Sequence, residues 1–232
     1  MAESADIVSS ESQSVILPNL DAGCSMAEMI DERMLTAALD ELSSMTRARI
    51  IPISYVNSSG AVKAVTGQNN GACCTSGNVR NVFEWAFQSE ADGGAGADKI
   101  LSVPDQHLGR NTAVAMGYSL DDCVVYNPAV PNGGLTPEAV EHARFILWKG
   151  HCYVHQFFKA EQIERARAED PGVHVVVHPE CPYEVVQLAD LSGSTEQIIS
   201  AVASSATGTH WVIGTEQNLV HRLAKRHPEQ RI

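Results

Sequence analysis

The sequence predicts an α/β protein built from parallel sheets, and three observations support this prediction. Short runs of β-branched and other apolar residues alternate with stretches of helical periodicity. The 232 residues are 44% hydrophobic, which suffices for globular cores. Short sequence elements also recur in the same order along the chain. Strict alternation favours parallel sheets with helices on both faces, and the recurrence favours pseudo-symmetric three-layer αβα domains.

The expected strands are short, apolar and separated by helical or turn signals. They are residues 50–56, 100–103, 123–126, 145–148, 173–177 and 211–213. The clearest helix places five apolar side chains on one face: Val79, Val82, Phe83, Ala86 and Phe87. Another helix is expected to start with Thr136 as its N-cap and Pro137 at its first helical position. Residues 92–97 are rich in Gly and Ala and are expected to form a surface loop.

These elements divide the chain into four predicted parts. Residues 1–14, rich in Ser and acidic residues, are expected to be a disordered tail. Residues 15–24 are interpreted as a remnant of a first domain that ends in a cysteine. Residues 25–151 are expected to form a complete α/β domain, and residues 152–232 a second repeat that is truncated at its C-terminus.

Four pairs of matched elements define the internal repeat. Residues 22–24 match 150–152, and the strand ends at 55–57 match 178–180. The hydroxyl pair at 75–76 matches 194–195, and the segment at 104–108 matches 215–219. In the first copy a strand, a helix, a further strand and a cysteine follow the last of these elements. By the same order, a third cysteine is expected in a longer chain.

The charge balance excludes several classes of partner. The chain has 16 Lys and Arg against 28 Asp and Glu, a formal net charge of −12, so a nucleic-acid partner is not expected. The apolar runs are too short to span a bilayer, and the first residues lack the pattern of a signal peptide. These features predict a soluble cytoplasmic protein without a membrane partner.

Six cysteines in such a chain indicate thiols or metal ligands rather than a disulfide framework. Pseudo-symmetry is expected to bring Cys24 and Cys152 together around one axis, and cysteines that converge from separate domains usually hold a metal. Thiolates select zinc, copper(I) or iron-sulfur clusters, and the spacing from Cys152 to His155 fits zinc by itself. The other four are expected to pack as buried thiols, with redox chemistry as an alternative for the last: Cys73, Cys74, Cys123 and Cys181.

Polar residues gather at the expected carboxyl ends of the strands, where parallel sheets bind ligands. They are Tyr55, Asn57, Ser76, His178, Glu180, Ser194 and Thr195. Hydroxyls and amides at helix N-termini suit a small carboxylate substrate, and His178 and Glu180 are placed to move protons. The alternative is purely structural: Ser76 and Ser194 would be N-caps, and His178 with Pro179 a turn.

Taken together, the segments closely resemble quinolinate synthase, the iron-sulfur enzyme of NAD biosynthesis. The resemblance runs from about residue 15 to residue 232 and rests on dense, ordered motifs. They are LPNLDAGCSMA (17–27), YVNSS (55–59), CTSGN (74–78), PDQHLGRNT (104–112), LWKGHC (147–152), VHPECP (177–182), GSTEQ (193–197) and IGTE (213–216).

The resemblance implies three pseudo-symmetric domains with a 4Fe-4S cluster where they meet, held by one cysteine from each domain. It implies a transferase that condenses iminosuccinate with dihydroxyacetone phosphate to quinolinate, with the open iron as Lewis acid. A functional link to L-aspartate oxidase or aspartate dehydrogenase follows. Cys24 and Cys152 would be cluster ligands, with a third ligand expected beyond Ile232. The implied catalytic residues are Tyr55, His178 and Glu180, and the implied substrate-binding residues are Tyr55, Val56, Asn57, Ser76, His178, Pro179, Glu180, Ser194 and Thr195.

The chain departs from this family in two places. The family's N-terminal part, which supplies a His, a Tyr and a Ser to the active site, has no counterpart before residue 15, and its third cysteine has none within the 232 residues. A cluster on two cysteines is expected to be labile. The alternative interpretation is therefore an inactive fragment or non-catalytic remnant without a stable cluster. A zinc hydrolase using Cys152, His155 and His178 is the least favoured hypothesis.

Overall fold

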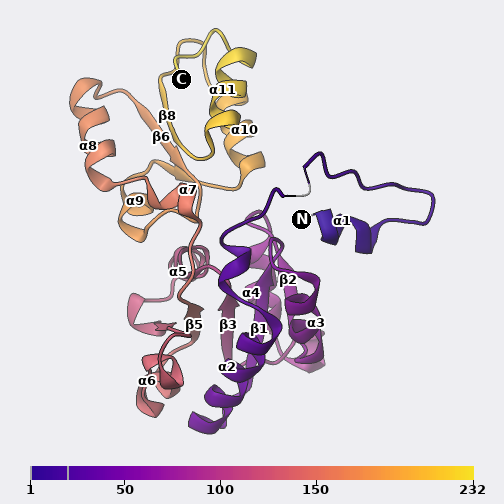
Figure 1. Cartoon of the computed structure of the whole chain (residues 1–232). Coiled ribbons are helices and arrows are strands. Elements are labelled where there is room, and N and C mark those ends of the chain that lie inside the picture. The colour runs from indigo at the N-terminus through magenta and orange to yellow at the C-terminus, as the bar shows by residue number, and fades with distance from the viewer. Residues whose placement is uncertain (1, 20) are drawn as a thin grey trace.

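The computed structural model describes residues 2–19 and 21–232, and its strands form two all-parallel sheets (Figure 1). The strands are β1 Ile50–Tyr55, β2 Ala72–Cys74, β3 Lys99–Val103, β4 Cys123–Tyr126, β5 Phe145–Trp148, β6 His174–Val177, β7 Leu191–Ser192 and β8 Trp211–Gly214. The α-helices are α1 Ala2–Val8, α2 Glu32–Met45, α3 Gly60–Gln68, α4 Val79–Phe87, α5 Gln106–Ala115, α6 Pro137–His142, α7 Tyr153–Gln156, α8 Ala160–Glu169, α9 Tyr183–Leu188, α10 Thr195–Ser204 and α11 Gln217–Arg226. Short 3-10 helices are η1 Ala27–Met29, η2 Glu90–Asp92, η3 Leu120–Asp122 and η4 Pro131–Gly134.

The first sheet has the order β2-β1-β3-β5-β4 and is covered by helices on both faces. Its strands are apolar on both sides because both sides are buried. Within β3, Ile100 packs with Phe83 of α4 and Leu108 of α5 on one face. The next residue, Leu101, packs on the other face with Leu35 of α2. This alternation gives the predicted three layers.

The second sheet repeats this arrangement with the order β7-β6-β8. Helices α8 and α9 cover one face through Ile163 and Val185. The opposite face is covered by α10 and α11 through Ile198 and Leu219. In Figure 1 this second unit lies above the first, in orange and yellow. Strand order and helix placement therefore match β2-β1-β3 and its helices, which confirms the predicted α/β class with repeated parallel sheets.

The repeat extends to individual hydrogen bonds. The Ile100 amide donates to the carbonyl of Arg144 at 3.0 Å, and the Trp211 amide donates to the carbonyl of Arg231 at 2.7 Å. Beyond the same strands, Asp105 caps α5 by accepting from the Leu108 amide at 2.5 Å. Glu216 caps α11 in the equivalent way, accepting from the Leu219 amide at 3.1 Å. The matched sequence elements are thus matched structural positions.

The structure differs from the sequence predictions in three places. Residues 2–8, expected to be part of a disordered tail, form α1, whose Glu3 carboxylate accepts from the Gly60 amide at 2.7 Å. Two short strands, β2 and β7, lie outside the predicted strand ranges; in β7, Leu191 is half exposed and gives no apolar run. Cys73 is exposed rather than packed, because β2 is an edge strand. Cys74 and Cys181 are buried as predicted, and Cys123 is partly buried.

Across the described ranges, none of the helices combines the length and the apolar character that crossing a membrane requires.

Candidate functional site

The carboxyl ends of β1 and β6 meet where the two units face each other. The Tyr55 hydroxyl, at the end of β1, lies close to the Glu180 carboxylate, which follows β6, and to the side chain of Ser76 after β2. Both Tyr55 and Glu180 are buried. Burial, followed by the charge of Glu180, raises the pKa of Tyr55, so its hydroxyl stays protonated at neutral pH. Three residues that were predicted from separate motifs therefore lie close together.

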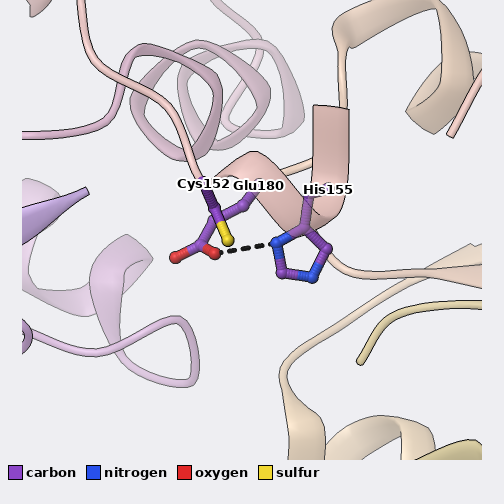
Figure 2. Close-up of side chains that lie close together, drawn as sticks. All are labelled: Cys152, His155 and Glu180. Carbon is purple, nitrogen blue, oxygen red and sulfur yellow. Dashed lines mark ion pairs between the residues drawn. The ribbon is translucent and has the colours of Figure 1, made fainter. Parts of the chain in front are cut away.

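A second group joins Glu180 to the short helix α7. Cys152 is the N-cap of α7 and His155 is its third residue, so both lie on one side of a single turn. Figure 2 shows the side chains of Cys152, His155 and Glu180 directed toward one another. The Nδ1 atom of His155 is 3.0 Å from the Oε2 atom of Glu180. All three donor atoms lie within 4.8 Å of one another, so the group could hold a metal ion.

His178 supports this group rather than joining it. Its ring stacks on that of His155 with centroids 4.6 Å apart. Its Nδ1 atom accepts a hydrogen bond from the Glu180 amide at 3.3 Å, which places the proton of the neutral ring on Nε2. Burial lowers the pKa of His178 to about 4. A neutral His178 thus holds both the backbone of Glu180 and the ring of His155.

His155 and Glu180 are arranged as a buried ion pair. Burial disfavours the charged form of His155, but its interactions with Cys152 and Glu180 outweigh this and raise its pKa to about 9. The same burial opposes ionisation of Glu180, yet His155 and His178 bring its pKa below the usual value. For Asp105, burial and then the nearby Glu180 charge raise the pKa well above the usual value.

Polar atoms in this region remain without partners among the described residues. They are Oε1 of Glu180, Oδ2 of Asp105, Nε2 of His155 and Oδ1 of Asn57, all of them buried. Unpartnered buried polar atoms are costly, and native proteins rarely retain them without a ligand, water or ion. Their concentration at the meeting point of the two units is typical of a binding site.

The other predicted cysteine lies beside Asn57. The Asn57 side-chain amide donates to the Cys24 sulfur at 3.7 Å. Cys24 and Cys152 pack against the same apolar cluster, which includes Tyr55 and Cys74. Cys24 is not part of the group formed by Cys152, His155 and Glu180.

Two further predicted residues, Ser76 and Pro179, border a cleft between the units. The cleft, about 540 Å³ in volume, is lined by residues of both units, among them Ser76, Asn111, Pro179 and Gly193. Ser194 is the N-cap of α10, as the structural alternative predicted. Ser76 is not an N-cap, because Asn78 holds that position before α4. Of the other two predicted site residues, Thr195 is exposed and Val56 is half-buried.

Two buried residues of this region, Asp105 and His155, were not among the predicted site residues. Asp105 is in the sequence motif at 104–112 and in the repeat, and both signals could have indicated it. The spacing from Cys152 indicated His155 as a zinc ligand, but its contact with Glu180 depends on how β6 packs against α7.

Fold and site define a class: a parallel α/β protein in which a partly buried thiol, a buried imidazole and a buried carboxylate lie together where two repeats meet. The family model described as quinolinate synthetase A protein matches residues 1–232. A quinolinate synthase of a Nocardioides species is 51% identical over 234 residues, and those of Streptomyces coelicolor and Corynebacterium glutamicum are 50% and 48% identical. The alignments include 100%, 97% and 100% of this chain, but 59%, 56% and 57% of the relatives.

The chain belongs to the quinolinate synthetase A family. It spans somewhat under two thirds of the length of the curated relatives that it matches.

Proposed function

We propose that this chain is the part of a quinolinate synthase that contributes two of its repeats, acting in de novo NAD biosynthesis in the cytoplasm. The observation that supports this most directly is that Tyr55, Ser76 and Glu180 lie close together. It joins three motifs of the family resemblance from two separate units. A purely structural role would not require the phenol of Tyr55, the hydroxyl of Ser76 and the carboxylate of Glu180 to lie together at the carboxyl ends of parallel strands.

The donor set fits an iron-sulfur cluster. Two thiols from equivalent positions of the repeat pack against one apolar cluster, and an amide of Asn57 already donates to the Cys24 sulfur. Thiolates supported by such hydrogen bonds are the ligands that iron-sulfur clusters use. Cys24 and Cys152 would hold a 4Fe-4S cluster together with a third cysteine. When bound, the cluster would supply an open iron that acts as a Lewis acid toward the substrates.

The protein side chains would bind the substrates and move protons. The proposed substrates are iminosuccinate and dihydroxyacetone phosphate, supplied in part by L-aspartate oxidase or aspartate dehydrogenase. Carboxylate and phosphate groups would meet N–H and hydroxyl donors, and six residues would contribute to binding: Val56, Asn57, Ser76, Pro179, Ser194 and Thr195. Tyr55, His178 and Glu180 would serve the proton transfers, with Tyr55 donating from its protonated hydroxyl.

Anaerobic reconstitution of the full-length protein with iron and sulfide tests this function. We expect about four irons per chain, broad visible absorption and synthesis of quinolinate. Cys24→Ser and Cys152→Ser should each lose most of the iron. Glu180→Gln should keep the absorption but lower kcat about 100-fold or more, because it removes a proton-transfer group.

Cys73→Ser is the matched control, since this exposed thiol lies outside the site and should leave iron content and rate unchanged. Iron binding that survives replacement of both Cys24 and Cys152 would contradict the assignment of the cluster ligands. A reconstituted protein without quinolinate synthesis would contradict the function itself.

A further inference from the structure

We propose that Cys152, His155 and Glu180 form a mononuclear site for a divalent transition metal such as zinc, which is filled when no cluster is bound. The site shares Cys152 with the cluster proposed above but requires neither Cys24 nor a third cysteine. It is therefore a property of this chain alone, and it stands or falls independently of the synthase activity.

The chemistry and spacing of the donors fit zinc. A thiolate, an imidazole and a carboxylate are the side chains that zinc prefers. With metal-ligand bonds of roughly 2.0–2.3 Å, neighbouring donors of a tetrahedral site lie about 3.2–3.8 Å apart. Here the Nδ1 to Oε2 separation is 3.0 Å, and all three donor atoms lie within 4.8 Å of one another. Only small side-chain movements are needed to accept an ion.

Burial gives the second, independent observation. The exposed fractions of His155 and Glu180 are 6% and 3%. The Oε1 atom of Glu180 and the Nε2 atom of His155 have no hydrogen-bond partner among the described residues. At the surface, water would supply the missing hydrogen bonds of such side chains. Here the side chains lie together in the interior without a complete set of hydrogen-bond partners. A bound cation would compensate the charge of the buried carboxylate.

The contacts of His178 favour Glu180 as the third metal ligand. The zinc site considered from the sequence had His178 in that position. The Nδ1 atom of His178 already accepts the Glu180 amide, and its ring is stacked on His155. Its position fixes the orientation of the two ligands, as residues behind a metal site commonly do. Three protein ligands leave the fourth position of a zinc ion to water.

Zinc and the cluster would then compete for the same thiol. A chain that has zinc at Cys152 cannot use this cysteine for iron, so zinc is expected to block cluster assembly.

Cobalt(II), a spectroscopic substitute for zinc, tests the site on the metal-free 232-residue chain. We expect one equivalent to bind, with visible bands of four-coordinate cobalt and a near-ultraviolet thiolate-to-cobalt charge-transfer band that zinc abolishes by displacement. Cys152→Ser should lose the charge-transfer band. His155→Gln and Glu180→Gln should weaken cobalt binding by about 100-fold or more, since even residues behind a metal site contribute 10–100-fold.

Two control variants separate this site from other thiols. Cys73→Ser tests the exposed thiol, and Cys24→Ser tests the second cluster ligand; both should leave the cobalt spectrum unchanged. Absence of the thiolate band in the unmodified chain, or its loss in Cys24→Ser, would overturn the proposal.

X-ray absorption on the zinc-loaded unmodified chain provides a test that does not depend on the folding of any variant. One sulfur and three nitrogen or oxygen neighbours are expected. Two or more sulfurs would overturn the proposal. A failure of zinc binding would leave the iron content of the reconstituted full-length protein unaffected, so the two proposals can fail separately.

Discussion

At the scale of single residues, Gly150 determines where Cys152 lies. A Cβ atom on Gly150 would be 2.0 Å from the carbonyl oxygen of Pro104, and the Gly150 carbonyl also accepts from the Gln106 amide at 3.1 Å. We expect Gly150→Ala to force these two segments apart and to lower the free energy of unfolding by about 1–3 kcal/mol. Cobalt affinity should fall as well, because Cys152 follows two residues later. Urea denaturation and cobalt titration measure the two effects.

Gly67→Ala is the matched control for that substitution. Gly67 lies on the exposed side of α3, where a Cβ atom would have no neighbouring atom within 4 Å. Alanine is more favourable than glycine within a helix, so the free energy of unfolding should rise by about 0.5–1 kcal/mol. Cobalt affinity should be unchanged. Equal behaviour of the two variants would show that the contact with Pro104 does not constrain Gly150.

Single residues also mark the limit of sequence prediction at the site. Tyr55, Ser76 and Glu180 were predicted because each lies at the carboxyl end of an expected strand or at the start of a helix, and parallel strands end at one edge. The ion pair between His155 and Glu180 could not be predicted, since it joins a helical turn to a strand end whose relative position no local pattern encodes.

At the scale of elements, α11 depends on its cap. The Glu216 carboxylate accepts from the amides of Asn218 at 2.9 Å and Leu219 at 3.1 Å, and these hydrogen bonds lower its pKa. A carboxyl with a lowered pKa in the folded state contributes stability above the ordinary pKa of 4.5, and this stability is lost as the pH falls through the folded value. Glu216→Gln should therefore cost about 0.5–1 kcal/mol at pH 7 and progressively less below pH 4.5.

The measurement is the free energy of unfolding from pH 3.5 to pH 7. Glu164→Gln, an exposed glutamate in the middle of α8, is the control and should show no such pH-dependent difference. A constant difference between Glu216→Gln and the unmodified chain across this range would contradict the capping role of the carboxylate.

Elements with a strong local signal were predicted nearly to the residue. Strands β4 and β5 match their predicted ranges, because short apolar runs rich in β-branched or aromatic residues have few alternatives. Helix α6 begins after its predicted cap, Thr136. Helix α1 and strand β7 were missed for the opposite reason: neither contains a buried residue. Contacts with distant segments, such as that of Glu3 with Gly60, hold such elements in place.

At the scale of the whole molecule, the repeat was readable from the sequence but the packing of its two copies was not. Matched motifs fixed the equivalence of Asp105 and Glu216, which the structure confirms as equivalent caps. The orientation of the two units depends on contacts that are not part of the repeat, between α5 of the first unit and the turn after β6 of the second. The predicted boundary at residue 152 between the two units stays a prediction.

Asn111 of α5 is the central contact between the units, and it holds the turn that contains Glu180. Its side-chain amide donates to the carbonyls of Pro179 at 2.8 Å and Cys181 at 2.9 Å, and the residue is buried. Asn111→Ala leaves two carbonyls without these donors, so we expect a loss of about 1–3 kcal/mol that falls on the contact between the units. Amide exchange at residues 178–181 should accelerate, and cobalt binding should weaken because Glu180 is no longer held in place.

The control is Asn69→Ala, which removes a comparable 2.8 Å hydrogen bond to Val65 inside the first unit and should leave exchange at 178–181 unchanged. If Asn111→Ala lowered stability without changing exchange at this turn, Asn111 would stabilise only its own helix, and the two units would be held together by the apolar contacts around it.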